Sequence, residues 1–326
     1  MSAVTTRTVA GDEAEIRLDR WFRRHFPGLA QGAIHRLCRT GQIRVDGKRA
    51  EAATRLPAGA EIRVPPLPEH DPPERQTVTV SEREAKDLHR LILYRDDHLI
   101  VLDKPSGLPV QGGPGIARSL DHMLDAFRFG HPERPRLVHR LDRDTSGVLA
   151  IARSAAAAAS LAAAFRGRDA EKTYWAVVVG LPVPLEGRID AALARAPGPR
   201  GERTRLAGKD EDEAARAITD YVTLDKAGRR AAWLELKPLT GRTHQLRVHC
   251  AGLGTPILGD GKYGTAGATL EGFAPRLHLH ARALRIPHPA GGVVEVAAEL
   301  PPHMTETFRG LGFTAPRTPA PRRAGR

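Results

Sequence analysis

The hydrophobic pattern of the first 66 residues changes from helical to alternating. Apolar residues recur at helical spacing over residues 16–22 and again over residues 34–38, as expected for two amphipathic helices. The segment "QIRVDGKR" at 42–49 alternates instead, and its Asp46-Gly47 pair is typical of a tight hairpin turn. The pattern predicts a small domain at residues 15–66, preceded by an N-terminal tail at residues 1–14.

The apolar pattern is interrupted on both sides of a second, larger segment. "PPLPEHDPPERQ" at 65–76 is rich in proline and has no apolar period, which predicts a linker over residues 67–90. "TAPRTPAPRRAGR" at 314–326 combines proline with arginine without apolar anchors, so we expect a disordered basic tail over residues 313–326. Residues 91–312 remain as the main domain.

Most periodic stretches of the main domain predict strands. Apolar runs on either side of a polar turn at 95–98 in "LILYRDDHLIVLDKPSGLPV" indicate two paired strands. Further strands are predicted at 136–141, 148–153, 172–180, 218–225, 230–238 and 291–300. "SAAAAASLAAAFRGR" at 154–168 predicts a helix capped by Ser154, and a second helix is expected to begin at a Thr243 cap and to end at Gly252 or Gly254. The fold class that follows is α+β with a large, mainly antiparallel sheet.

Charge narrows the class of partner. The 326 residues contain 50 Lys and Arg against 38 Asp and Glu, a formal net charge of +12, which favours a polyanion such as nucleic acid. An arginine-rich composition would give the same excess, so charge does not identify the nucleic acid. No apolar run approaches the roughly 18 residues of a membrane helix, and the N-terminus lacks the apolar core of a secretory signal. We expect a cytoplasmic protein that does not cross a membrane.

An acidic loop joins two of the predicted strands. "LVHRLDRDTSG" at 137–147 places Asp142 and Asp144 among arginines and before a Thr-Ser-Gly turn. A solvated turn would accept the same residues. The loop by itself therefore does not show whether either carboxylate carries chemistry.

The chain resembles the RluA-type pseudouridine synthases, especially the RluC and RluD branch, in four segments that occur in the same order. They are "HRLDRDTSG" at 139–147, "EKTYWAVVVG" at 171–180, "LTGRTHQLRVHCAGLGTPILGDGKYG" at 239–264 and "LHLHARAL" at 277–284. Residues 15–66 resemble the S-four-like RNA-binding domain of that branch through "RLDRW" and "RTGQIRVDGK". The resemblance covers residues 15–312. It implies a pseudouridine synthase fold with a small S-four-like domain, and an isomerase that acts on large-subunit ribosomal RNA without a cofactor.

The resemblance also implies roles for individual residues. Asp142 corresponds to the essential carboxylate, Arg242 to the arginine that pairs with it, and Tyr174 to the tyrosine that stacks on a uracil flipped out of the RNA. A bidentate guanidinium would hold the carboxylate plane and favour its charged form. Arg140 corresponds to the residue that enters the space vacated by the base, and Asp144 lies outside the reaction. The other residues assigned to substrate binding are His139, Thr145, Gly147 and His244.

Basic residues of the small domain are expected on its non-core faces, where they would contact phosphates. They are Arg20, Arg23, Arg24, Arg36, Arg39, Arg44 and Lys48. The histidines at 244, 249, 278 and 280 lack the spacing of a helical zinc pair, so we expect no metal site. The resemblance further implies a monomer.

Two alternatives to a ribosomal RNA enzyme stay open. Transfer RNA is the competing substrate within the same class. A non-catalytic RNA-binding or ribosome-assembly protein could keep the same fold, although the presence of Asp142, Tyr174 and Arg242 together counts against it. A metal-dependent hydrolase would need ligands that the sequence does not show.

Overall fold

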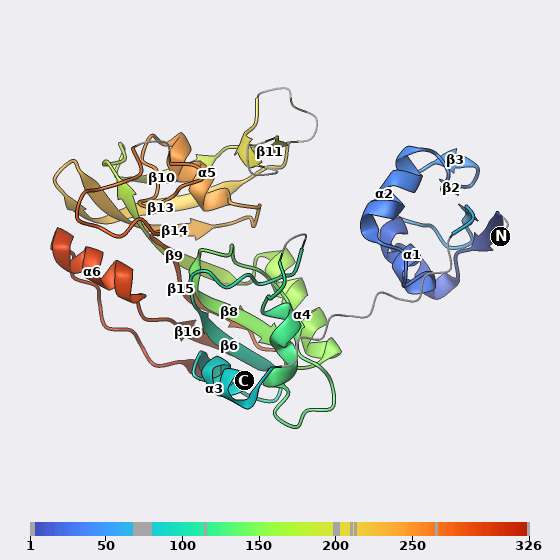
Figure 1. Cartoon of the computed structure of the whole chain (residues 1–326), viewed down its shortest axis with the longest axis horizontal. Helices are drawn as coiled ribbons and strands as arrows, with labels where there is room; N and C mark the ends of the chain where they lie inside the picture. Colours follow the sequence, from blue (N-terminus) through green and yellow to red (C-terminus); the bar gives the residue numbers. More distant parts are fainter. Residues whose placement is uncertain are drawn as a thin grey trace. The chain divides into compact units, whose positions relative to one another are not determined.

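The computed structural model describes residues 4–67, 80–113, 116–197, 203–208, 211, 214–264 and 267–324. The chain divides into two compact units, Met1–Thr77 and Val78–Arg326, and Figure 1 shows both. The division falls within residues 67–90, where we predicted a linker.

In the smaller unit, two helices share one core with a four-stranded sheet. The helices are α1 (Leu18–His25) and α2 (Gln31–Arg39), preceded by a short 3-10 helix η1 (Gly11–Glu13). The sheet has the order β1 (Thr5–Thr8), β4 (Glu61–Val64), β2 (Arg44–Val45), β3 (Lys48–Arg49). Trp21, Phe22 and Ile34 are fully buried, as the helical spacing predicts. Asp46 and Gly47 both have positive φ, the backbone conformation that the predicted two-residue hairpin turn requires.

The N-terminal tail expected over residues 1–14 differs from the structure in its described part. Thr5–Thr8 forms strand β1, which pairs antiparallel with β4. Glu13 is buried and accepts a hydrogen bond of 2.9 Å from Nε1 of Trp21. All four side chains of β1 are exposed, so its backbone hydrogen bonds hold the strand and its sequence carries no apolar alternation. Residues 1–3 lie outside the described residues.

A sheet of eleven strands forms the frame of the larger unit. Its main path has the order β10-β13-β14-β9-β15-β8-β6-β5, with β7 beside β8, and β16 and β17 continuing from β15. The strands are β5 (Ile92–Arg95), β6 (Leu99–Lys104), β7 (Arg136–Leu137), β8 (Ser146–Ala152), β9 (Glu171–Val179), β10 (Glu186–Asp190), β13 (Ile218–Ala227), β14 (Ala231–Pro238), β15 (Leu279–Pro287), β16 (Val293–Ala297) and β17 (Arg322–Ala324). A separate two-stranded sheet contains β11 (Leu193–Ala196) and β12 (Arg203–Leu206). Among the described strand pairs of the large sheet, only β8 with β15 is parallel, which confirms the α+β, mainly antiparallel prediction.

Strand β15 occupies the middle of the sheet, a position that the sequence pattern did not single out. One edge of β15 pairs with β9, and the other edge pairs first with β8 and then with β16. The parallel contact brings Gly147 of β8 against Ala281 of β15. Gly147 has a φ of +107°, and a Cβ there would lie 2.2 Å from the carbonyl oxygen of Ala281. Only glycine allows the two backbones to approach this closely.

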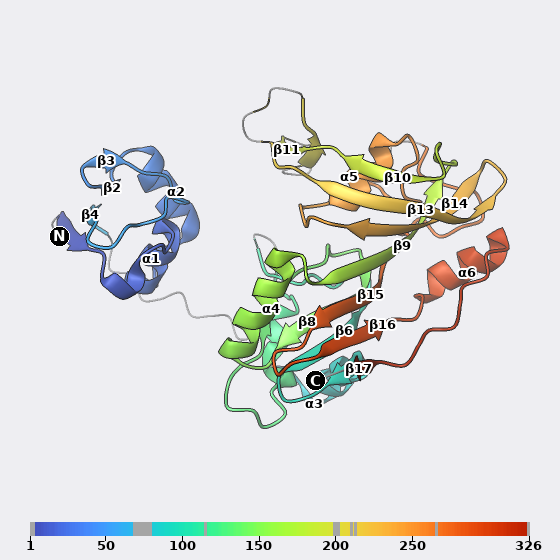
Figure 2. The same cartoon turned by 180° about the vertical axis from the view of Figure 1, so that it is seen from behind.

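The alternation of β9 decides which of its side chains face the site. Ala176 and Val178 pack in the core beneath helix α5 (Gln245–Gly252), and Tyr174 borders that core. Trp175 and Val177 point to the opposite face, where they pack against helix α6 (Pro302–Leu311). Because side chains alternate along a strand, Lys172 and Tyr174 share the face of α5. Figure 1 shows α5 beside β13 and β14, and Figure 2 shows α6 at the margin of the sheet.

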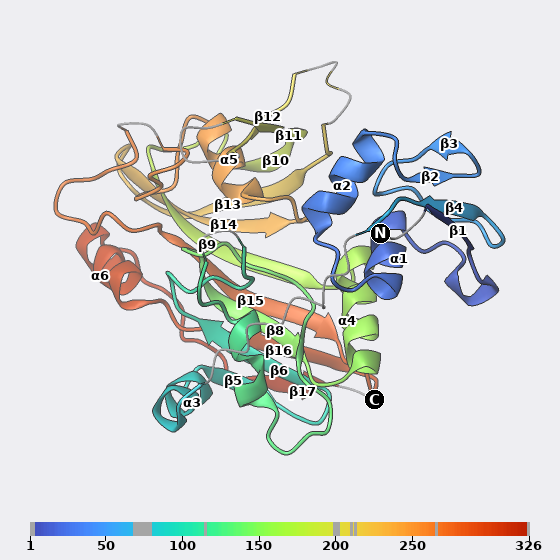
Figure 3. The same ribbon diagram turned by 45° about the vertical axis from the view of Figure 1, so that its right-hand side comes forward.

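Helix α4 (Ala155–Gly167) covers another part of the sheet. The Ser154 side chain accepts a hydrogen bond from the backbone N–H of Ala157, so the predicted N-cap is confirmed. Ala157 and Leu161 pack against Val148 and Ala150 of β8, and α4 lies beside β8 in Figure 3. None of the helices in the described part of the chain is both long and apolar enough to cross a membrane.

The expected linker and tail are shorter in the structure than in our prediction. Residues 68–79 of the linker lie outside the described residues, but Glu82–His89 forms helix α3 with a capping box between Ser81 and Glu84. At the C-terminus Phe313 is buried, and β17 pairs with β16 while Arg322 binds Glu295. Each segment adds only one or two apolar residues to the core, Leu88 in α3 and Phe313 at the C-terminus, so its sequence shows no apolar period. The strand predicted over 136–141 is also shorter, because β7 ends at Leu137 and the following residues form the acidic loop.

A buried lysine fastens this loop to the sheet. Lys104 ends β6 and is 1% exposed. Its ammonium donates hydrogen bonds to the carbonyls of Pro105, Leu108 and Arg143, at 2.9, 3.0 and 3.0 Å. Burial lowers the pKa of Lys104 to about 8, against the attraction of nearby carboxylates. The three carbonyl bonds use the full donor capacity of an ammonium group.

We predict that Lys104→Met lowers the free energy of unfolding by at least about 2 kcal/mol, because buried carbonyls lose their donor. Urea denaturation followed by circular dichroism would measure the change. Lys237→Met is the control, since Lys237 is 58% exposed and pairs with Glu235 on the surface. Equal stability of the two variants would contradict the role of Lys104 as the anchor of the loop.

Candidate active site

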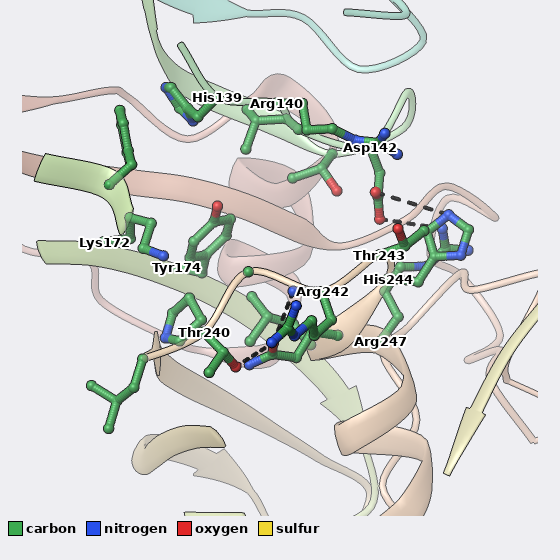
Figure 4. A pocket seen from close by; sticks show the side chains of 18 of the residues that line it. His139, Arg140, Asp142, Lys172, Tyr174, Thr240, Arg242, Thr243, His244 and Arg247 are labelled. Carbon is green, nitrogen blue, oxygen red and sulfur yellow. Dashed lines mark hydrogen bonds and ion pairs between the residues drawn. The ribbon is translucent and has the colours of Figure 1, made fainter. Parts of the chain in front are cut away.

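A pocket of about 710 Å³ opens in the larger unit where the acidic loop, the start of β9 and the start of α5 meet. Figure 4 shows its side chains. Among the described lining residues there is a single acid, Asp142. The positively charged or titratable basic residues that line it are His139, Arg140, Arg166, Arg168, Lys172, Arg242, His244 and Arg247. The pocket therefore suits an anionic ligand and places one carboxylate inside a cationic wall.

Asp142 is held by the backbone of its loop. The N–H of Thr145 donates to the carbonyl of Asp142 at 3.2 Å, and the N–H of Gly107 donates to the carbonyl of Arg143 at 2.9 Å. The hydroxyl of Ser106 donates to the carbonyl of Asp144 at 2.8 Å. Together with Lys104, these bonds fix the direction from which the Asp142 side chain enters the pocket, where it remains 17% exposed.

The guanidinium that faces Asp142 belongs to Arg247. Its Nη1 lies 3.7 Å from Oδ2 of Asp142. Its Nε and Nη2 donate to both oxygens of Asp260, at 2.8 and 2.7 Å. The Arg247 and Asp260 side chains are 8% and 1% exposed. Burial alone would lower the pKa of Arg247, but the hydrogen bonds and charge of Asp260, with the charge of Asp142, raise it above its usual range.

The predicted pairing of Arg242 with Asp142 is therefore wrong. Arg242 is exposed at the rim, and its Nε donates to the carbonyl of Arg216 at 3.1 Å. Arg242 precedes α5, whereas Arg247 lies inside the helix, three residues after His244. His244, the residue before the helix, and Arg247, in its first turn, both reach Asp142. Spacing along the chain did not show that Arg247, and not Arg242, would face the carboxylate.

Helix α5 begins differently from the prediction. Thr243 is not its cap, because the helix starts at Gln245 and the N-cap residue is His244, with a left-handed φ of 55°. The side-chain oxygen of Gln245 accepts the backbone N–H of Arg242 at 3.1 Å and the hydroxyl of Thr240 at 2.7 Å. Gln245 thus holds the turn that precedes the helix.

His244 lies between Asp142 and a buried tyrosine. Its Nε2 is 3.9 Å from Oδ1 of Asp142, and its Nδ1 is 2.5 Å from the hydroxyl of Tyr263. Burial lowers the pKa of His244, with Asp142 opposing this effect. The imidazole is therefore neutral near pH 7.

Tyr174 lines the pocket from β9, as expected. Burial, and then the charge of Asp142, raise the pKa of its phenol, so the hydroxyl stays protonated at all physiological pH values. Lys172 lines the same wall two residues earlier, and burial lowers the pKa of its ammonium. Figure 4 shows both side chains on one side of the pocket and Asp142 on another.

Of the remaining residues that we assigned to substrate binding, two line the pocket without another evident side-chain role, and two have structural contacts. Arg140, exposed at the rim, and Thr145, buried behind Asp142, both line the pocket. His139 also lines it, but its Nε2 accepts the N–H of Ala150 at 2.8 Å and its ring stacks on Phe165 at 4.3 Å. Burial lowers the pKa of His139 to about 3, so its ring is neutral and packed. Gly147 is not among the lining residues and serves the contact between β8 and β15.

The other histidines are held apart by separate partners. His249 bonds to Thr219, His278 to Thr307 and His280 to Ser146. Across the described ranges of the chain, no group of three or more His, Cys, Asp or Glu residues is placed to hold a metal ion. In the smaller unit, the basic residues assigned to RNA are all exposed: Arg20, Arg23, Arg24, Arg36, Arg39, Arg44 and Lys48.

Comparison with known proteins identifies this arrangement. Residues 98–252 match the family described as RNA pseudouridylate synthase. Ribosomal large subunit pseudouridine synthase C of Escherichia coli K12 is 36% identical over 300 residues, covering 88% of this chain and 89% of the relative. The chain belongs to the RNA pseudouridylate synthase family. It is an isomerase that modifies RNA by forming pseudouridine.

Two further relatives support the family assignment. RNA pseudouridine synthase 4, mitochondrial, of Arabidopsis thaliana is 34% identical, with 85% of this chain and 72% of the relative covered. The solved structure of human RNA Pseudouridylate Synthase Domain Containing 4 is 31% identical and has a TM-score of 0.61 over 72% of this chain and 97% of that chain. The fold expected from the resemblance is thereby confirmed for the larger unit.

We predict that Arg247→Lys lowers the single-turnover rate of pseudouridine formation at least tenfold, about 1.4 kcal/mol of transition-state stabilisation. A lysine keeps the charge but cannot bind Asp260 through two parallel bonds while facing Asp142. Arg242→Lys is the matched comparison and should cost much less. A larger loss of rate in Arg242→Lys than in Arg247→Lys would contradict this assignment and support the pairing of Arg242 with Asp142 that we predicted from the sequence.

Proposed function

We propose that this enzyme converts specific uridines of large-subunit ribosomal RNA to pseudouridine, with Asp142 as the catalytic carboxylate. The observation that carries the proposal is the isolation of Asp142, the one acid among the described residues of a pocket otherwise lined by basic and neutral side chains. Ribosomal RNA enters the proposal through the names of the bacterial relatives, which are ribosomal large subunit pseudouridine synthases.

The reaction sets clear demands on the protein. The bond between ribose C1′ and N1 of uracil breaks, the base turns, and a bond forms between C1′ and C5. The proton on C5 is lost and N1 gains one, so the reaction needs no oxidant, reductant or further reactant. Whether Asp142 attacks C1′ or removes a proton from the ribose, it must act as an ionised carboxylate. The positive charge of Arg247, 3.7 Å from Oδ2, attracts the carboxylate in that form.

The pocket must also accept a nucleotide that has left its stack. Unstacking costs a few kcal/mol, which contacts with the flipped base offset. In the proposal, the ring of Tyr174 stacks on the uracil, and its protonated hydroxyl donates a hydrogen bond. Arg140, exposed at the rim, is placed to enter the space that the base leaves in the RNA. Arg166 and Arg168, which also line the pocket, are available to phosphates of the flanking nucleotides.

The smaller unit adds phosphate contacts in this proposal. Its exposed basic residues and the formal net charge of +12 suit a sequence-independent attraction to RNA. We retain its description as an S-four-like RNA-binding domain as part of the proposal. Action as a monomer in the cytoplasm also stays a prediction, and one of the relatives is named as mitochondrial.

The decisive experiment maps pseudouridine across ribosomal and transfer RNA from cells with and without the gene. We predict that a ribosomal signal disappears with the gene, returns with the wild-type protein and with Asp144→Asn, and does not return with Asp142→Asn. Asp144 is a matched control, because it lies two residues away and its carboxylate pairs with Arg143 at 3.0 Å. Loss of a transfer RNA signal instead would show that the substrate is transfer RNA. Appreciable activity of Asp142→Asn would refute the assigned carboxylate, and an RNA map that does not change would favour a non-catalytic role.

We also predict that replacing Arg36 and Arg39 of α2 by glutamine weakens RNA binding and reduces its salt dependence. The slope of log K against log salt should fall by about one for each RNA phosphate that the variant no longer neutralises. Arg309 and Arg317, exposed in the larger unit and outside the pocket lining, give a control with the same change of charge. Filter binding at several salt concentrations measures both slopes, and identical slopes for the two double variants would contradict a specific role of the smaller unit.

A further inference from the structure

The proposed mechanism leaves unused a tyrosine that contacts His244, one of the residues that line the pocket. Tyr263 is 7% exposed, and its hydroxyl lies 2.5 Å from Nδ1 of His244. Its backbone N–H donates to the carboxylate of Asp260 at 3.0 Å, the same carboxylate that orients Arg247. The guanidinium carbons of Arg203 and Arg247 both lie 5.0 Å from the centre of its ring. The ring is therefore fixed from several sides.

The hydrogen bonds of this hydroxyl determine where its proton lies. The backbone N–H of Thr204 donates to the Tyr263 oxygen at 3.2 Å. A phenol carries one proton, and among the described residues its other hydrogen-bond partner is Nδ1 of His244. Nδ1 is the acceptor that these residues offer to the phenol proton, which favours donation from the hydroxyl to Nδ1. Because a neutral imidazole has one N–H, donation in this direction puts the ring proton of His244 on Nε2.

The Nε2 atom is the one that faces the carboxylate. It lies 3.9 Å from Oδ1 of Asp142, while Arg247 approaches the other oxygen. Figure 4 shows His244 and Arg247 on the same side of Asp142. A distance of 3.9 Å is longer than a direct hydrogen bond, and such contacts often shorten when a substrate binds.

We propose that Tyr263 is a positioning residue, which keeps the proton of His244 on Nε2 so that the imidazole acts as a neutral hydrogen-bond donor toward Asp142 and its substrate. Arg247 then supplies charge to one carboxylate oxygen and His244 supplies a donor to the other. The inference rests on the proposed role of Asp142.

The backbone at His244 sets the direction of its ring. Its φ of 55° is left-handed, a conformation that histidine, like asparagine and aspartate, adopts more often than other residues with a side chain. Here the conformation directs the ring from the start of α5 toward both Asp142 and Tyr263.

The tautomer can be read without any assay of activity. Nitrogen chemical shifts of the histidine rings in the full chain distinguish Nε2–H from Nδ1–H, and the His244 signals are those missing in His244→Gln. We expect Nε2–H in the wild type and a mixed or reversed tautomer in Tyr263→Phe. An Nδ1–H tautomer in the wild type, or the same tautomer in Tyr263→Phe, would overturn the proposal. This outcome is independent of whether the protein proves to modify ribosomal RNA.

Kinetics then test whether the tautomer matters. Tyr263→Phe keeps the ring and removes only the hydroxyl, and we expect a loss of about 10- to 100-fold in the single-turnover rate, with the Kd for RNA within about twofold. Tyr221→Phe is the control, because Tyr221 is also buried but its hydroxyl donates to the carbonyl of Pro184 and not to a residue of the pocket. Equal rates for Tyr263→Phe and wild type would refute the role.

Two single variants, His244→Gln and His244→Asn, distinguish a role of His244 as a hydrogen-bond donor from a purely structural role. The glutamine amide reaches about as far as Nε2, whereas the asparagine amide reaches only as far as Nδ1. A left-handed backbone favours asparagine, so a structural role predicts that His244→Asn is the better variant. The proposal predicts higher activity for His244→Gln, and predicts that adding Tyr263→Phe to it costs less than about threefold, since the two residues act in series. An equal cost of Tyr263→Phe in both backgrounds would overturn the proposed coupling.

The pH profile gives a last check on the neutral donor. The groups around His244 are Asp142 and Asp260, which favour its protonated form, and Arg247 and Lys262, which oppose it, together with Tyr263. If His244 acts only as a neutral donor, its own protonation takes no part in the reaction. We then expect His244→Gln to have the same dependence of rate on pH as the wild type between about pH 6 and about pH 8, the range in which an ordinary histidine titrates. A pH-dependent step that disappears in His244→Gln would show instead that His244 itself exchanges a proton during the reaction.

Discussion

The buried ion pair between Arg247 and Asp260 is the interaction on which the site depends. Both guanidinium-to-carboxylate bonds are short, and the two side chains are 8% and 1% exposed. Removing either partner would leave an uncompensated buried charge. Asp260 also accepts the backbone N–H groups of Lys262 and Tyr263. One carboxylate thus aims the cation at Asp142 and shapes the turn that carries Tyr263.

The other side of the site is built from a different part of the sheet. Lys104 and the turn that follows it hold the acidic loop through backbone carbonyls, so Asp142 is fixed by the β6 and β8 region. Arg247 and His244 come from α5, and Tyr174 comes from β9. Strand β15 joins these regions, because it pairs with β9 on one edge and with β8 on the other. The close contact at Gly147 allows this junction, and the carboxylate and its cation meet across it.

Under the proposed function, this construction lets one pocket combine RNA binding with chemistry at an ionised carboxylate. Basic side chains line most of the wall and suit a phosphate backbone, while Asp142 sits among them. The cation nearest to Asp142 already shares its charge with Asp260, so it is oriented before any RNA arrives. Preorganised charges of this kind lower the cost of reorganisation during a reaction. The neutral, buried His139 and the protonated Tyr174 complete the wall without adding charge.

The sequence by itself determined the local features of this protein. Helical spacing predicted α1 and α2, Ser154 marked the start of α4, and the segments around Asp142 and Tyr174 identified the family and the pocket residues. The expected partner of Asp142 was wrong, because linear order does not show that Arg247, inside a helix, reaches further into the pocket than Arg242 before it. Strands β1 and β17 were not predicted from the sequence, because exposed strands are held by backbone hydrogen bonds and need no apolar pattern. Only the tertiary structure decided which charges are buried together, because Asp142, Arg247 and Asp260 are brought together by sheet pairing and not by spacing along the chain.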